Sequence, residues 1–133
     1  MTVFLDKLKC GQDVEPYRQS PLVLAYIGDC VYELFIRTYL ITNSNLPVQK
    51  LHKRTTEYVN SKAQAEFYHR IKDKLSEEEE SIYKRGRNAK STVPKSSSLS
   101  DYKSATGIEA LIGYLYLSGK EERIFELLRE CID

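Results

Sequence analysis

The sequence contains few of the features that mark secreted, membrane-spanning or zinc-binding proteins. Its three cysteines lie far apart, at positions 10, 30 and 131, and form no C-x-x-C pair. The two histidines have no ligand spacing to each other or to a cysteine, which argues against a zinc site. The first residues lack the basic stretch, apolar run and cleavage site of a signal peptide. These absences favour a reducing compartment, and we predict a cytoplasmic protein.

The sequence also lacks an overall charge of one sign. Twenty Lys and Arg residues against 19 Asp and Glu residues give a net charge of +1, so any surface that binds an anion must be local. The apolar stretch 21–41 is long enough to suggest a membrane helix, but Asp29, Glu33 and Arg37 interrupt it. We therefore expect no membrane association. The motifs of P-loop, dinucleotide-binding and G-x-S-x-G enzymes are also missing.

No segment alternates polar and apolar residues for long enough to predict a strand, whereas helical spacing recurs along the whole chain. The fold class is therefore predicted to be all-α, in one domain of residues 20–133 that follows an N-terminal arm of residues 1–19. The expected helices cover 21–41, 46–74 with a break near Asn60, 77–87 after a capping box at Ser76, 103–119 and 121–132. A loop over 88–101 connects the third and fourth of them.

Two of these helices carry a lone acid close to a glycine on an otherwise apolar surface. Asp29 directly follows Gly28, and Glu109 is the only charge in the run 104–119, one turn before Gly113. A buried carboxylate is costly unless a cation meets it, and glycine lets another backbone or a ligand approach closely. Magnesium is held by one or two carboxylates and keeps several waters. We therefore predict that the two helices meet and that Asp29 and Glu109 bind one Mg²⁺.

Each acid also has a structural interpretation, which the sequence leaves open. Glu33 and Arg37 are in the favourable order for an ion pair on the face of the helix that carries Asp29. The alternative for Asp29 is therefore an ordinary, partly exposed helix face held by this pair. Thr106 and Glu109 have the spacing of a capping box at a helix start, which would need no metal.

Positive charge gathers in the segment before Glu109. Residues 84–103 contain six basic residues against one acid, Asp101, and a second basic region covers 49–74. The six are Lys84, Arg85, Arg87, Lys90, Lys95 and Lys103. Local basic patches neutralise phosphates, so we predict that 84–103 binds an anion, the alternative being an ordinary solvated surface.

Three motifs taken together resemble the catalytic domain of the ribonuclease III family. They are LAYIGD at 24–29, RGRNAKS at 85–91 and T-x-x-E-A-L-I-G-Y-L at 106–115, and the resemblance covers about residues 20–133. It implies a helical bundle that acts as a homodimer on double-stranded RNA, with magnesium at each site. Asp29 and Glu109 match the acids of the two catalytic motifs, which implies that both are catalytic and metal-binding.

The closer resemblance is to the short form of the family. Two further acids of full-length members are replaced here by Ala25 and Thr106, as in the short form. The fourteen residues after Gly119 are too few for the separate RNA-binding domain of full-length members, so we expect 84–103 to bind the RNA. Glu33, Thr106 and Asp101 are the candidates for auxiliary groups at the site.

The expected function is therefore a Mg²⁺-dependent endoribonuclease that cuts double-stranded RNA and leaves 5′-phosphate and 3′-hydroxyl ends. The resemblance implies a role in maturation of large-subunit (23S) ribosomal RNA from its precursor. The apolar helix 21–41 is expected to supply the dimer contact. Two alternatives stay open: a catalytically inactive RNA-binding module of the same fold, suggested by Ala25 and Thr106, and a helical scaffold protein in which Asp29 and Glu109 are structural.

Overall fold

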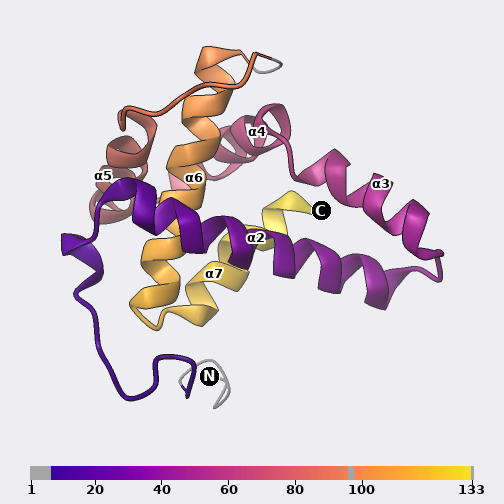
Figure 1. Cartoon of the computed structure of the whole chain (residues 1–133), viewed down its shortest axis with the longest axis horizontal. Helices are drawn as coiled ribbons and strands as arrows, with labels where there is room; N and C mark the ends of the chain where they lie inside the picture. Colours follow the sequence, from indigo (N-terminus) through magenta and orange to yellow (C-terminus); the bar gives the residue numbers. More distant parts are fainter. Residues whose placement is uncertain (1–6, 96–97, 133) are drawn as a thin grey trace.

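The computed structural model describes residues 7–95 and 98–132, and over these residues it contains helices and no strand (Figure 1). The α-helices are α2 (Pro21–Asn43), α3 (Val48–Tyr58), α4 (Ser61–Ile71), α5 (Glu77–Arg87), α6 (Leu99–Leu117) and α7 (Glu121–Leu128). Short 3₁₀ turns are η1 (Pro16–Arg18), η2 (Lys72–Lys74) and η3 (Arg129–Cys131). The all-α prediction is confirmed. Residues 1–6 of the predicted arm lie outside the described residues.

Local capping signals set several helix ends where the sequence predicted them. The Ser20 side chain accepts a hydrogen bond from the Val23 amide at 3.2 Å, ahead of a proline in the first turn of α2. At α5 the predicted capping box is present. The predicted break near Asn60 is also confirmed, because the Asn60 side chain caps α4. The single expected region 46–74 is thus two helices and a 3₁₀ turn.

Other boundaries differ from the prediction. Helix α2 continues two residues beyond 41, because Thr42 and Asn43 donate side-chain hydrogen bonds to carbonyls one turn back. Helix α6 begins at Leu99 rather than 103, because the Ser98 side chain accepts from the Asp101 amide. The predicted loop is correspondingly shorter. The last helix ends at Leu128, and its final residues form a 3₁₀ turn instead.

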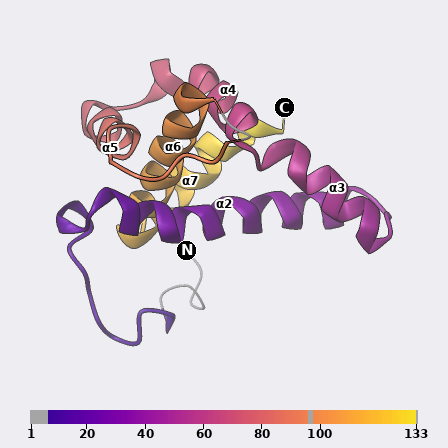
Figure 2. The same ribbon diagram turned by 45° about the horizontal axis from the view of Figure 1, so that its top comes forward.

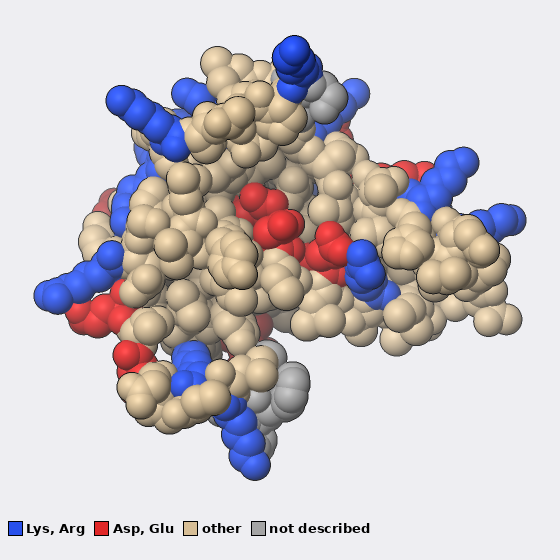
Figure 3. All heavy atoms as spheres, in the orientation of Figure 1, with Lys and Arg blue, Asp and Glu red and all other residues tan. Residues whose placement is uncertain are grey.

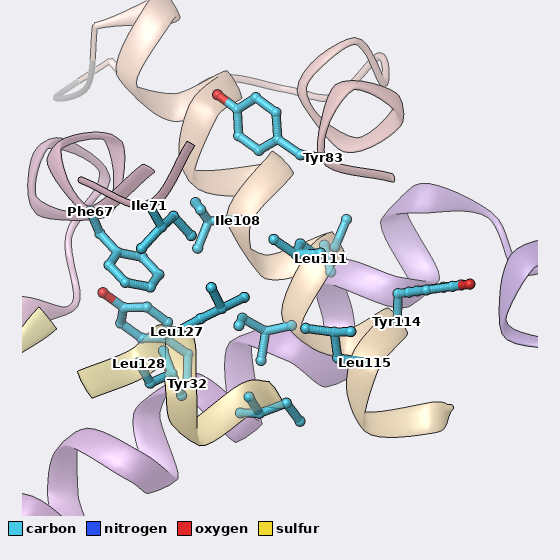
Figure 4. Packing of buried hydrophobic residues seen from close by; sticks show 14 of the residues in the cluster. Tyr32, Phe67, Ile71, Tyr83, Ile108, Leu111, Tyr114, Leu115, Leu127 and Leu128 are labelled. Carbon is cyan, nitrogen blue, oxygen red and sulfur yellow. The ribbon is translucent and has the colours of Figure 1, made fainter. Parts of the chain in front are cut away.

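Helix α6 lies at the centre of the molecule (Figures 1 and 2). Helix α2 crosses it on one side, α4, α5 and α7 pack around it, and α3 runs beside the C-terminal half of α2. Every residue from Ser104 to Leu115 is buried except Glu109. Figure 4 shows Ile108, Leu111 and Leu115 of α6 meeting side chains from α2, α4 and α7. Each fully buried Leu or Ile stabilises the fold by about 1.5–3 kcal/mol, so the burial of α6 is a main source of the fold's stability.

The crossing of α2 and α6 is made possible by two glycines. A Cβ atom on Gly28 would lie 1.7 Å from the carbonyl oxygen of Glu109, and a Cβ on Gly113 would lie 1.9 Å from that of Leu24. Such distances are impossible, so backbone touches backbone at both positions. The predicted close approach is confirmed.

Within residues 7–95 and 98–132, no helix has the combination of length and apolar character that spanning a bilayer requires.

Candidate active site

Asp29 and Glu109 meet at the crossing of α2 and α6, although they are eighty positions apart in the chain. The Glu109 carboxyl group interacts with the Asp29 side chain, which helps to raise the pKa of Glu109. It also accepts a hydrogen bond at Oε2 from Nε2 of Gln64, at 3.2 Å. Asp29 is exposed and Glu109 is half-buried. The pair is therefore reachable from solvent but partly enclosed by protein.

The surroundings of Glu109 disfavour its charged form. Burial, followed by the negative charge of Asp29, raises the pKa of Glu109 to about 8, and the Gln64 amide acts in the opposite direction. A carboxyl group whose pKa is raised by burial and by a neighbouring acid in a cleft is typical of functional sites. A divalent cation between the two groups would offset the negative charge of Asp29 and lower the pKa of Glu109. Both carboxyl groups would then be ionised.

The donor set at this crossing suits magnesium. The two interacting carboxyl groups come from different helices, and both line the same groove. Among the described residues there is no cluster of three or more Asp, Glu, His or Cys that could hold a metal. Magnesium needs only one or two carboxylates, because water and substrate phosphate fill the remaining positions. The site thus fits Mg²⁺ and does not fit a metal that requires a complete protein cage.

The groove beside the pair has a volume of about 770 Å³ and is formed by α2 and α6. Its lining residues include Ala25, Tyr26, Glu33, Tyr102 and Thr106 together with the two acids. Figure 3 shows acidic side chains in a hollow at the middle of this face, with lysines and arginines at several places around it. An acidic hollow with positive charge around it is an arrangement that can hold a metal ion under a bound polyanion.

The two positions without acids, Ala25 and Thr106, both line the groove and are both buried. The Thr106 hydroxyl donates to the carbonyl oxygen of Tyr102 at 3.1 Å, inside α6. Thr106 and Glu109 therefore lie in the interior of the helix, and the capping-box interpretation of these residues is wrong because Ser98 is the cap.

The predicted auxiliary acids differ in position. Glu33 lines the groove, and its carboxylate forms the predicted ion pair with Arg37 at 2.5 Å. Asp101 lies in the first turn of α6 beside Tyr102, and it is not one of the described residues that line the groove.

The predicted RNA-binding residues lie on α5, the following loop and the start of α6. Lys84, Lys90, Lys95 and Lys103 are exposed. The guanidinium group of Arg87 lies 5.8 Å from the centre of the buried Tyr83 ring, which limits its freedom. Gly86 fixes the end of α5 on α6, since a Cβ there would lie 2.7 Å from the Ala110 Cβ.

Arg85 has partners within the protein that the sequence did not indicate. Its guanidinium group donates to the carbonyl oxygens of Tyr17 at 3.1 Å and Gln19 at 3.0 Å, and it lies 5.1 Å from the centre of the Tyr17 ring. Arg85 therefore holds the segment before α2 against α5.

Gln64 was missed as a site residue. A signal was present in the sequence, because Gln64, Phe67 and Ile71 follow one another at spacings of three and four, which places a polar residue on the core-facing side of α4. That pattern predicts a buried polar group, but it does not identify the group's partner on another helix.

A second, apolar groove lies on the other side of α2, against α7. Its lining includes Val31, Phe35, Ile124 and Phe125, and Ile27, Cys30 and Leu34 line both grooves. The acidic groove is thus continuous with an apolar surface.

Comparison with known proteins gives one consistent result. The family description "Ribonuclease III domain" matches residues 22–120. The chain is 57% identical over 110 residues to Mini-ribonuclease 3 of Thermoanaerobacter sp., which covers 82% of this chain and 78% of that protein. It is 48% identical over 132 residues to Mini-ribonuclease 3 of Clostridium tetani, which covers 98% of this chain and 86% of that protein. It is also similar to the X-ray crystal structure of a Fusobacterium nucleatum protein, with a TM-score of 0.83 and 38% identity over 90% of this chain and 98% of that one.

Proposed function

The chain belongs to the ribonuclease III family of endoribonucleases, and we propose that it hydrolyses double-stranded RNA with Mg²⁺ held by Asp29 and Glu109. The observation that carries this proposal is that these two carboxyl groups interact and line one open groove. Their positions match the acids of the two family motifs. This interaction also argues against the scaffold alternative, in which each acid would have its own structural partner.

The reaction follows from the groups at the crossing. Asp29 and Glu109 would hold the ion from two helices, and Glu109 would release its proton as the ion binds. The chemistry that bound Mg²⁺ supplies is polarisation of the scissile phosphate and activation of a water. In-line attack of water on the phosphorus would break the bond to the 3′-oxygen and leave a 5′-phosphate and a 3′-hydroxyl. The groove wall orients the strand, and the backbone contact at Gly28 keeps the two acids in register.

We propose that RNA is held by phosphate contacts with basic residues of α5, the following loop and the start of α6. The residues are Lys84, Arg85, Arg87, Lys90, Lys95 and Lys103, with Arg85 acting mainly through its hold on residues 17–19. A-form RNA has a deep, narrow major groove that side chains do not read, so recognition would depend on shape and 2′-hydroxyl groups. Glu33 and Thr106, which line the groove, would contact waters around the ion, and Asp101 would act from the start of α6.

We further propose a homodimer, with the apolar groove between α2 and α7 in the contact. Leu34 and Phe125 both line this groove and are 58% and 54% exposed, so they contribute to one contiguous apolar surface that is open to solvent. A two-fold dimer would place one site on each strand of a duplex. The three cysteines are free, in keeping with a cytoplasmic protein. Resemblance to the short form supports the 23S ribosomal RNA precursor as the substrate.

A cleavage assay on double-stranded RNA tests the metal site directly. Asp29→Asn and Glu109→Gln are expected to lower the rate by at least about 100-fold, because each removes a charged ligand without changing shape. RNA binding should persist in both variants. Glu122→Gln, at an exposed acid of α7, is the matched control and should cut like the wild type. Full activity in Asp29→Asn would refute the proposal, whereas binding without cleavage by the wild type would favour the inactive RNA-binding module.

A further inference from the structure

Gln64 is a polar side chain at a place where helices usually pack with apolar residues. It lies on α4 and is only 3% exposed. Phe67, three residues later on the same helix, points into the core (Figure 4). Burying an amide is costly unless it finds a hydrogen-bond partner. The Gln64 side chain finds that partner in Glu109, to which Nε2 donates at 3.2 Å.

This hydrogen bond acts on the orientation of the Glu109 carboxylate. The acid pair is brought together by α2 and α6 alone, and a glutamate side chain retains several rotatable bonds that the backbone does not fix. Gln64 adds a contact from a third helix, α4. An ionised carboxylate has about four acceptor positions, so a single donor at Oε2 restricts the rotation of the group and leaves the other positions for a cation.

Such orientation matters more here than in a site with four acids. Ala25 and Thr106 occupy the positions of the further acids of full-length relatives, so two carboxylates must hold the ion. We propose that Gln64 is a positioning residue that keeps Glu109 in the orientation that binds Mg²⁺. The inference rests on the metal site proposed above. Hydrogen-bond partners of metal ligands commonly contribute about 10- to 100-fold to metal affinity or activity.

The test replaces Gln64 by methionine, which has similar length and volume but no N–H group. Binding of Mg²⁺ alone to the full chain is measured by calorimetry, and cleavage is measured as a function of Mg²⁺ concentration. We expect the Kd for Mg²⁺ to rise about 10-fold or more. The Mg²⁺ concentration for half-maximal cleavage should rise equally, while KM for RNA stays unchanged and kcat recovers at high Mg²⁺.

Phe67→Leu is the matched control, because it disturbs the same helix contact without touching Glu109. It should lower Tm and leave the Kd for Mg²⁺ unchanged. Wild-type Mg²⁺ affinity in Gln64→Met would overturn the inference, and so would an equal loss of affinity in both variants. The larger proposal is tested separately by Asp29→Asn. If Asp29→Asn loses Mg²⁺ binding and Gln64→Met binds Mg²⁺ normally, only the role of Gln64 is refuted. Normal Mg²⁺ binding in Asp29→Asn would refute the metal site itself.

A measurement on the wild type serves if Gln64→Met does not fold. The side-chain amide signal of Gln64 is followed by ¹⁵N NMR during a Mg²⁺ titration, with exposed Gln49 of α3 as the reference. The Gln64 signal should shift and saturate at the calorimetric Kd, while the Gln49 signal stays in place. A Gln64 signal that does not respond to Mg²⁺ would overturn the inference.

Discussion

Replacing Gly28 by alanine should damage both the fold and the site, against the usual direction of this substitution. Alanine in place of a helical glycine ordinarily stabilises by about 1 kcal/mol. Here the added Cβ would lie 1.7 Å from the Glu109 carbonyl oxygen and 2.7 Å from the Gly113 amide nitrogen. Ordinary contact begins at 3.4 Å, so α2 must move by about 1.7 Å, because neither neighbour is a flexible side chain.

The size of the effect follows from that displacement. Overpacking of a well-filled core costs about 1–3 kcal/mol, which exceeds the gain in helix propensity. The unfolding midpoint should fall by several degrees, measured by calorimetry. A shift near 1 Å at reacting groups costs about 100-fold in rate, so cleavage at saturating Mg²⁺ should fall by at least that factor. Ser81→Ala, at an exposed position of α5, controls for a helical alanine substitution. A Gly28→Ala variant with raised Tm and full activity would refute the close crossing.

Three further predictions concern charge. Because the pKa of Glu109 is raised to about 8, its proton must leave when Mg²⁺ binds, so affinity should weaken as pH falls from about 8 to 6. Calorimetry in buffers of different ionisation enthalpy measures the released proton, and binding without release would contradict the reasoning. Glu79 is buried and bonded twice to Arg123 at 2.8 Å, so Arg123→Ala should cost about 3 kcal/mol in denaturant unfolding while kcat stays unchanged. Those hydrogen bonds lower the pKa of Glu79, so the pair stabilises the fold fully above about pH 4.5, and this stabilisation is lost as pH falls through the lowered pKa. If Arg123→Ala lowers the free energy of unfolding equally at pH 7 and at pH 3, that result would argue against the pair. Lys90→Ala should weaken RNA binding and reduce the slope of log affinity against log salt by about 1, whereas Lys120→Ala should not; equal slopes would exclude Lys90 as a phosphate contact.

The helix ends that could be predicted are those that one or two neighbouring side chains decide. Ser20 before Pro21 and the capping box from Ser76 are such signals, and both are confirmed. The start of α6 was misplaced because the stretch 96–100 offers several serines as caps. Only the contact of Ser98 with the Asp101 amide distinguishes one of them, and composition cannot report that contact.

The meeting of Asp29 and Glu109 could be predicted in outline, because each acid has a glycine within a turn and glycine marks a close approach. Gln64 could not be assigned in the same way. Its role depends on the rotation of α4 about its own axis against α6, and that rotation is set by the packing of several helices in the core rather than by a local signal. Sequence spacing gives the faces of a helix but not the facing residue on another helix.

Asp29 and Glu109 are held near each other against their mutual repulsion, and this is the strongest physical argument that the pair serves a function. Every other residue from Ser104 to Leu115 is buried, so an apolar side chain at position 109 would suit the helix better than a carboxyl group. The crossing at Gly28 prevents the two acids from separating, because the backbone of Gly28, next to Asp29 in the chain, already touches the backbone of Glu109. An arrangement that forces two acids together is stable only at some expense to the fold, and departures of this kind concentrate at functional sites. In the function proposed above, a small divalent cation would relieve this repulsion, and two rigidly held acids would be enough to hold it because Mg²⁺ keeps several waters.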